Sequence, residues 1–181
     1  LLSQQQRVVC SVNLPITYPP MKVNGCMVSD DVLRPHGGVF THPVDLAFNI
    51  AEGLRGAHRE AQVPAILESL RIPCTGSNSI TLSLALDKAK TKQILASEGI
   101  PTPPWQLFPN PSTPLNPRLE FPLMVKPNRE GSSKGIWRES VVGDEASLRR
   151  QVARIYERYR LVVLVEEFIE GTELTAGVLG G

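Results

Sequence analysis

Apolar and polar positions alternate most clearly in the second half of the chain, where they predict three strands and one helix. Phe121–Lys126 is an apolar, β-branched run of strand length, and Ile136–Val142 is expected to return beside it as a hairpin. Asp144 is a typical N-cap for a helix over Glu145–Tyr159, whose apolar positions recur every three or four residues. Leu161–Phe168 then follows as an apolar strand that ends in two carboxylates.

The first half carries a shorter pattern of the same kind. Val44–Ile50 has the apolar run of a buried strand, Gln62–Leu70 has a helical apolar face, and Arg71–Thr75 is extended. This order is typical of a βαβ unit in a parallel sheet. Ile80–Ser97 predicts a further helix, or two joined helices. A last strand is expected over Glu173–Leu179.

Prolines and glycines mark the expected domain limits. The prolines at positions 101, 103 and 104 predict an extended linker, and a domain boundary is placed there. Many prolines and glycines also interrupt the N-terminal stretch, where only Arg7–Val12 has a strand-like pattern. The chain is therefore expected to comprise an irregular segment over 1–43, an α/β domain over 44–100 and a second domain over 101–181.

Composition excludes several classes of protein. The 181 residues are 41% hydrophobic, enough to bury a core, and the net charge of +1 argues against a nucleic-acid or anionic-membrane partner. No apolar run approaches the roughly 18 residues of a membrane span. The three cysteines are widely separated and form no CxxC pair. A cytoplasmic location fits this cysteine usage better than a disulfide framework or a zinc site.

The loop that follows the predicted strand Phe121–Lys126 is the leading candidate for a binding site. Lys126 and a proline precede a polar loop that holds two serines between Gly131 and Gly135. The N–H groups and hydroxyls of such a loop can face an anion, and the lysine adds a positive charge. A phosphate ligand is therefore predicted, although the lysine precedes the glycines, unlike in a Walker A motif. A plain surface lysine is the alternative.

The carboxylates near the chain's end form a second candidate site. Glu166 and Glu167 are either solvated charges at a strand end or acceptors for a purine amino group, and Glu173 could bind ribose hydroxyls. Neighbouring side chains alternate faces on a strand, so the first two are not expected to share one Mg²⁺ ion.

Several stretches together resemble the D-alanine–D-alanine ligase family of the ATP-grasp superfamily. They keep the order and spacing of that family between residues 44 and 181. The matching stretches are Phe48–Gly53, Arg71–Ser77, Leu86–Lys92, Gly99–Pro104, Phe121–Gly135 and Val165–Gly177.

The resemblance implies a fold and an activity. The 44–100 part would be a parallel-sheet substrate domain preceding the ATP-grasp, and the 101–181 part an incomplete ATP-binding domain. Enzymes of this family phosphorylate the carboxylate of one D-alanine with ATP. The amine of a second D-alanine then displaces phosphate from the acyl phosphate, which yields a dipeptide for peptidoglycan synthesis.

The resemblance also implies residue roles. Lys88 and Lys126 would contact ATP phosphates beneath a mobile loop over Glu130–Gly135, in which Ser132 orients substrate as a catalytic residue. The other implied ATP contacts are Glu130, Ser133, Glu166, Glu167, Phe168, Ile169 and, at the ribose, Glu173. Glu52 and Arg59 are the implied contacts for the amino-acid substrate.

Two departures from the family pattern keep alternatives open. The family's N-terminal glycine-rich segment has no match in residues 1–43, and the segment from Glu52 to Glu60 also differs. Another amino-acid or peptide ligase with a different acceptor therefore remains open, as does a non-catalytic nucleotide-binding module. The ligands of the expected Mg²⁺ cofactor, and the family's catalytic arginine, would lie beyond residue 181. Small molecules are the expected partners, and a homodimer is one option.

Overall fold

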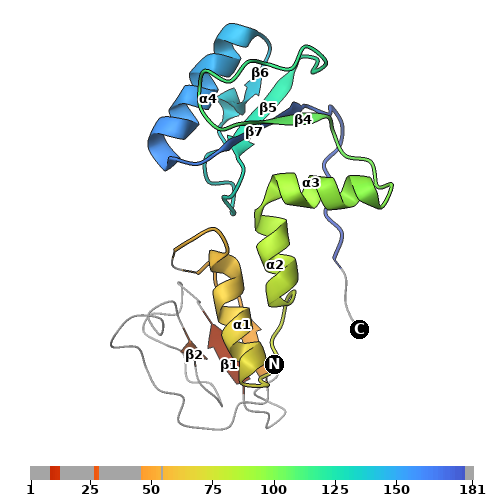
Figure 1. Ribbon diagram of the computed structural model, residues 1–181. Helices are drawn as coiled ribbons and strands as arrows, with labels where there is room; N and C mark the ends of the chain where they lie inside the picture. The colour runs from red at the N-terminus through yellow and green to blue at the C-terminus, as the bar shows by residue number, and fades with distance from the viewer. Residues whose placement is uncertain (1–8, 13–26, 29–45, 54, 178–181) are drawn as a thin grey trace. The chain divides into compact units, whose positions relative to one another are not determined.

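The computed structural model describes residues 9–12, 27–28, 46–53 and 55–177 (Figure 1). Its contacts divide the chain into two compact units, Leu1–Thr91 and Lys92–Gly181. The sequence placed the boundary after residue 100, at the prolines, whereas the division falls inside a helix. The reason is that the Lys92 ammonium group donates hydrogen bonds to Thr102 and Pro103, which ties the end of this helix to the second unit.

The first unit contains a parallel three-stranded sheet in the order β2-β1-β3. β1 (Val9–Val12) pairs in parallel with both β2 (Met27–Val28) and β3 (Leu46–Asn49). β1 falls within the predicted strand over residues 7–12. β2 lies in the segment predicted to be mostly irregular and was not identified from the sequence, because a two-residue strand is too short to show periodicity. The other expectations for residues 1–45 lie outside the described residues.

A helical crossover connects β3 to an extended segment beside it. The 3₁₀ turn η3 (Arg59–Ala61) leads into α1 (Gln62–Ser69), which buries Val63, Pro64 and Leu67. The chain then returns alongside β3, where Ala47 N–H donates to Pro73 O at 2.8 Å and Thr75 N–H donates to Ala47 O at 2.9 Å. The strand, helix and extended piece predicted from the sequence are therefore all present, with slightly shorter bounds.

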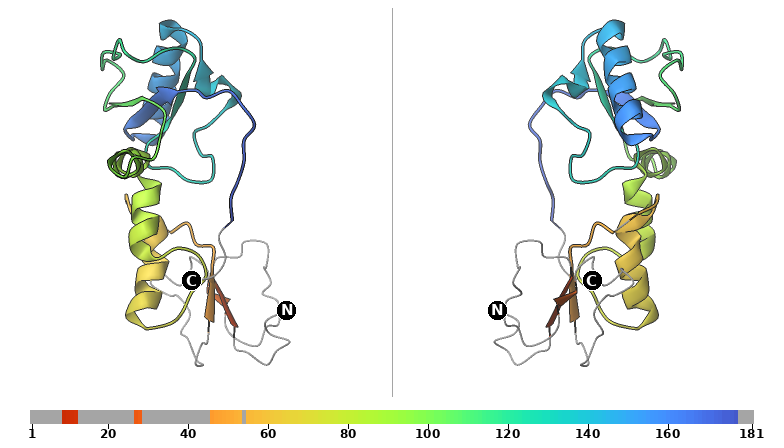
Figure 2. Two further views of the ribbon diagram at one scale, coloured as in Figure 1. Left: turned by 90° about the vertical axis from the view of Figure 1, so that its right-hand side faces the viewer. Right: turned by 90° about the vertical axis from the view of Figure 1, so that its left-hand side faces the viewer.

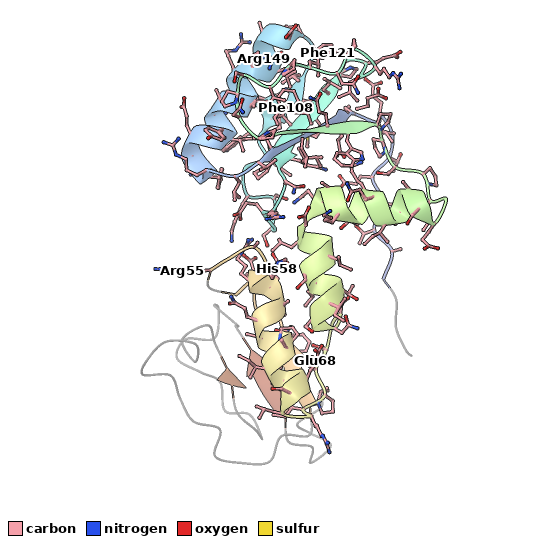
Figure 3. All side chains as sticks on the ribbon, viewed as in Figure 1. Arg55, His58, Glu68, Phe108, Phe121 and Arg149 are labelled. Carbon is pink, nitrogen blue, oxygen red and sulfur yellow. The ribbon has the colours of Figure 1, made fainter. Side chains whose placement is uncertain are left out.

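Two helices follow rather than one. α2 (Ser79–Leu86) and α3 (Lys88–Ser97) are separated by Asp87, whose extended backbone breaks the helix and whose carboxylate accepts from Lys90 N–H at 3.2 Å. The start of α2 is held by Glu68 of α1, whose carboxylate accepts from the N–H and the hydroxyl of Ser79 at 2.8 and 2.6 Å. These hydrogen bonds lower the pKa of Glu68 below its usual range. Glu68 lies near the end of α1, and His58 lies at the opposite end of that helical segment, just before η3 (Figure 3).

The second unit is an antiparallel sheet in the order β4-β7-β5-β6, with one helix on one face. Its strands are β4 (Trp105–Phe108), β5 (Leu123–Pro127), β6 (Val141–Val142) and β7 (Val163–Glu167). α4 (Glu145–Tyr159) begins at its predicted N-cap, Asp144, and packs along β5, β6 and β7 (Figure 2).

Three features of this unit differ from expectation. β4 was not predicted, because it follows directly on the prolines of the linker. The returning hairpin strand is reduced to β6, which is preceded by the 3₁₀ turn η4 (Arg138–Ser140). The predicted strand over residues 173–179 is wrong in its described part, 173–177. Those residues form no ladder and are exposed, Leu174 to 86%.

The core of the second unit lies between α4 and one face of the sheet. Val125 on β5 is directly opposite Val165 on β7, and both are fully buried. The helix contributes Leu148, Val152 and Ile155, which are spaced by four and three residues and share one face. At the edge of this layer the Arg149 guanidinium lies 5.7 Å from the centroid of the Phe108 ring (Figure 3).

Candidate functional site

The second face of the sheet in the Lys92–Gly181 unit carries charged residues. Successive side chains point to opposite faces of a strand, so the burial of Val125 and Val165 in the core turns Lys126 and Glu166 to the other side. Lys126 is directly opposite Leu164, two positions from Glu166 on β7. Side chains at such diagonal positions on adjacent strands are within reach of each other when they are long.

Glu166 binds two ammonium groups at once. Its Oε2 lies 2.7 Å from Nζ of Lys92, which comes from α3, and its Oε1 forms an ion pair with Nζ of Lys126. The side chains of Lys92, Glu166 and Lys126 are 8%, 10% and 20% exposed. We call these three residues the lysine–glutamate cluster.

The cluster is charged and net positive. Burial by itself would raise the pKa of Glu166, but the hydrogen bonds and positive charges of Lys126 and Lys92 outweigh it and lower that pKa below its usual value. The carboxylate is therefore ionised at neutral pH. Two ammonium groups and one carboxylate leave a net charge of +1. The interpretation of Glu166 as a solvated strand-end charge is therefore wrong.

Glu167 points the other way, as predicted for neighbours on a strand. Its carboxylate accepts a hydrogen bond from the backbone N–H of Glu120 at 3.0 Å, and its position is opposite Leu123 of the core face. The two carboxylates therefore have different partners on opposite faces of the strand.

The loop after β5 is a tight turn that exposes two serines. Ser132 and Ser133 have φ angles of 50° and 57°, in the left-handed region, and both are exposed. The turn is closed by backbone hydrogen bonds, from Lys134 N–H to Gly131 O at 3.0 Å and from Ile136 N–H to Ser133 O at 3.1 Å. The hydroxyls predicted to face an anion are therefore accessible to a ligand.

Gly135 fixes the far end of this loop. Its φ of 79° lies in the left-handed region, and an added Cβ would overlap the Pro127 ring, 2.9 Å from Cδ, and approach Tyr159 Cε2 to 3.2 Å. The backbone can approach β5 this closely only without a side chain. The glycine therefore anchors the loop to the sheet while its serine tip remains exposed.

The remaining predicted nucleotide contacts follow the end of β7. Phe168 N–H donates to Pro122 O at 2.9 Å, and the Phe168 ring is 39% exposed. Ile169 is 70% exposed and Glu173 is also exposed. The roles of Glu130, Ser132, Ser133, Phe168, Ile169 and Glu173 stay predictions.

Glu52, Arg59 and Lys88 belong to the first unit and are described apart from the cluster. Gly53 turns with φ of 73°, and an added Cβ there would overlap the Arg59 backbone, 2.9 Å from its Cα. The structure therefore brings the backbone next to Glu52 against Arg59 at the start of η3. Both are half-buried, as is Lys88 in the first turn of α3.

Lys92 is a site residue that the sequence analysis did not identify. It lies one helical turn after Lys88, and two lysines four residues apart share a helix face. That spacing was the available signal, but it gave no reason to expect a buried partner. The partner, Glu166, comes from a strand more than sixty residues away.

No metal centre or membrane helix is found in the part of the chain that the structure describes. Among those residues, no three histidine, cysteine or acidic side chains are grouped so that they could bind a metal ion. Likewise, none of the described helices combines the length and apolarity needed to cross a bilayer.

Comparison with known proteins identifies the relatives of this chain. The family model described as "D-ala D-ala ligase C-terminus" matches residues 94–181. The D-alanine–D-alanine ligase of Methylococcus capsulatus is 35% identical over 162 residues, which cover 87% of this chain and 48% of that protein. The corresponding ligase of Methylibium petroleiphilum is 42% identical over 134 residues, which cover 70% and 41%.

The fold has a solved counterpart as well. The crystal structure of the D-alanine–D-alanine ligase from Bacillus anthracis matches 91% of this chain and 58% of its own, with a TM-score of 0.65 and 26% identity. This chain spans about half the length of the curated relatives it matches. The family model, the sequence matches and the shared mixed α/β fold with an antiparallel sheet agree, and together they support a fragment of the D-alanine–D-alanine ligase type.

Proposed function

We propose that this chain carries the nucleotide-binding site of an ATP-dependent ligase that joins two D-alanine molecules. The observation that carries the proposal is the lysine–glutamate cluster, a net-positive group. It adjoins the loop over Glu130–Gly135, which we call the glycine-serine loop. The chain is similar to the D-alanine–D-alanine ligases described above, and the B. anthracis ligase has been crystallised in complex with ATP. The architecture is an ATP-grasp, with residues 44–100 as the substrate domain and 101–181 as the ATP-binding domain.

In this proposal Lys126 binds the phosphates of ATP. An ammonium group has three donors, and the ion pair with Glu166 uses one of them. The exposed Ser132 and Ser133 add hydroxyl and backbone N–H donors at the loop tip. Lys88 and Glu130 complete the contacts, and Ser132 also orients the substrate.

The base and sugar of ATP would lie at the end of β7. The half-exposed Phe168 ring and Ile169 offer an apolar surface for a purine, and Glu166 and Glu167 are the other proposed contacts to the base. The Glu173 carboxylate can accept hydrogen bonds from ribose hydroxyls. The predicted contacts to the amino-acid substrate are Glu52 and Arg59.

The chemistry requires a phosphate to be transferred in the absence of water. ATP phosphorylates a D-alanine carboxylate, and the amine of the second D-alanine attacks the acyl phosphate and expels phosphate. The residues described contribute charge neutralisation at Lys126 and a loop that can cover the transferred group, since water would hydrolyse the intermediate.

The described residues do not provide the Mg²⁺ ligands expected for such an enzyme. Both oxygens of the buried Glu166 are bound to ammonium groups, and Glu167 is directed to the Glu120 N–H. Carboxylates already neutralised in this way are poor ligands for a hard cation. Neither Glu166 nor Glu167 is therefore proposed as a Mg²⁺ ligand.

The proposed location is the cytoplasm, and the proposed partners are small molecules. ATP and D-alanine are the ligands, and dipeptide made for peptidoglycan is the product. A homodimer is proposed as the assembly, and sedimentation of the full-length protein would show whether it forms.

The test of ATP binding is the Lys126→Ala variant of the full-length protein. We expect its ATP affinity by calorimetry to fall at least about tenfold, because a charged hydrogen bond to phosphate is lost. Lys90→Ala, which removes an exposed lysine from α3, is the matched control and should bind ATP as the wild type does. Unchanged affinity in Lys126→Ala would refute the proposed role.

A further inference from the structure

Lys92 is a buried ammonium group with no donor left for a ligand. It donates to Glu166 Oε2 at 2.7 Å, to Thr102 Oγ1 at 2.6 Å and to Pro103 O at 3.1 Å. An ammonium group has three hydrogens, so these three acceptors satisfy it. Its side chain is 8% exposed, against 20% for Lys126. Lys92 therefore cannot act by direct contact with a nucleotide.

The charge of Lys92 matters through Glu166. Lys126 and Glu166 alone would form a neutral ion pair, and a neutral pair attracts a phosphate only weakly. A second buried ammonium on the other carboxylate oxygen makes the group net positive. Salt screens a buried charge less than an exposed one, so this positive charge persists at physiological ionic strength.

The lysine–glutamate cluster thus divides two tasks between two lysines. Lys126, on β5, is the more accessible ammonium and borders the glycine-serine loop. Lys92, on α3, is held by the Thr102–Pro103 segment and faces the opposite oxygen of the same carboxylate. Glu166 orients the first lysine, and the second lysine compensates the charge of Glu166.

We infer that Lys92 is a positioning residue of the nucleotide site. Its ammonium group balances the negative charge of Glu166, which leaves the positive charge of Lys126 to attract a phosphate group. The inference rests on the proposed function, because the phosphate in question is that of ATP. A purely structural role, in which Lys92 only ties α3 to the sheet, is the alternative to be distinguished.

Affinities for ATP and adenosine separate the two roles. In the full-length protein, Lys92→Met should weaken ATP binding about tenfold, the effect of one unit charge acting over roughly 12 Å at an effective dielectric constant near 20. Adenosine has no phosphate, so its affinity should change by less than about twofold, since uncharged contacts are left in place. Equal losses for both ligands, or no loss for ATP, would overturn the inference.

Two further variants serve as controls. Thr102→Val removes one acceptor of Lys92 but keeps its charge, so the ratio of ATP to adenosine affinity should stay near that of the wild type. The double variant Lys92→Met/Glu166→Gln removes one positive and one negative charge. Its ATP-to-adenosine ratio should recover toward the wild-type value, because Lys126 again provides a net charge of +1. A ratio as low as in Lys92→Met would contradict the charge argument.

A second measurement tests the ion pair between Lys92 and Glu166 in the absence of nucleotide. With ¹³C-labelled glutamate side chains, the titration of Glu166 can be followed by NMR in the wild type and in Lys92→Met. We expect its pKa to rise in the variant, and an unshifted titration would overturn the inference even where ATP binds. If the wild type binds neither ATP nor adenosine, the proposed function fails instead, and the NMR result still decides whether Lys92 compensates Glu166.

Discussion

At the scale of single residues, the decisive feature is a carboxylate shared by two lysines. Glu166 is buried among Lys92 from α3 and Lys126 from β5, and these are the charged groups that face it among the described residues. Loss of either partner would leave a buried charge less compensated, and such losses typically cost several kcal/mol. This arrangement links the stability of the second unit to pH.

The contribution of Glu166 to stability should disappear in acid. Its pKa is lower in the folded chain than in the unfolded chain, so the carboxylate stabilises the fold above the unfolded-state pKa of about 4.3. That stabilisation is lost as pH falls below this value through the folded-state pKa. Urea unfolding at pH 7, 5 and 3.5 should therefore show Glu166→Gln less stable than the wild type at pH 7 and closer to it at pH 3.5.

Glu170→Gln is the matched control for this comparison, since it removes one exposed carboxylate three residues after the end of β7. It should lie near the wild type at every pH. A Glu166→Gln deficit that stayed constant from pH 7 to pH 3.5 would show that the charge of Glu166 does not stabilise the fold.

At the scale of elements, one turn joins the sheet to the predicted phosphate loop. β5 delivers Lys126 at one end of the loop, and Gly135 returns the chain against Pro127 of the same strand. The left-handed backbone and the absence of space for a Cβ are independent reasons for glycine at this position. The element as a whole holds two exposed serines beside a buried charge cluster.

Gly135→Ala should destabilise the second unit by about 1–3 kcal/mol, through overlap with Pro127 and an unfavourable φ. Gly143→Ala is a matched control, because an added Cβ there has no neighbour within 4 Å. Thermal unfolding measures both variants. If Gly135→Ala melted at the wild-type temperature, the close packing of this turn would be contradicted.

At the scale of the whole molecule, two units supply different parts of the proposed reaction. The cluster and the loop lie in Lys92–Gly181, while Glu52, Arg59 and Lys88 lie in Leu1–Thr91. The departures from the family pattern fall in the first unit, around Glu52 and Arg59. The choice of amino-acid substrate is therefore expected to depend on the first unit.

The full-length protein should release phosphate from ATP when D-alanine is supplied. A coupled phosphate assay across D- and L-amino acids measures this, with ATP alone as the blank. The Lys126→Ala variant should lose this turnover, because its phosphate site is lost. Turnover only with other amino acids would remove D-alanine as substrate and keep the ligase proposal.

Much of the second unit could be predicted from the sequence, because its elements depend on local patterns. The N-cap Asp144 accepts from Ser147 N–H at 2.7 Å, and α4 has the bounds that its apolar spacing predicted. β5 and β7 likewise follow from apolar runs. Shorter elements were missed or predicted too long: β2 and β6 have two residues each, and β4 has four directly after prolines.

The sequence by itself determined the resemblance to D-alanine–D-alanine ligases, the candidate phosphate loop and the strand end that carries Glu166. Only the tertiary structure decided that Lys92 belongs with them, and that Lys126 and Glu166 are paired rather than separate. The physical reason is that periodicity reports which side of an element is buried, whereas an ion pair depends on the register between strands distant in sequence. Glu166 reaches Lys126 because Met124 is opposite Glu166 and Lys126 opposite Leu164, a register set by the packing of the whole sheet on α4.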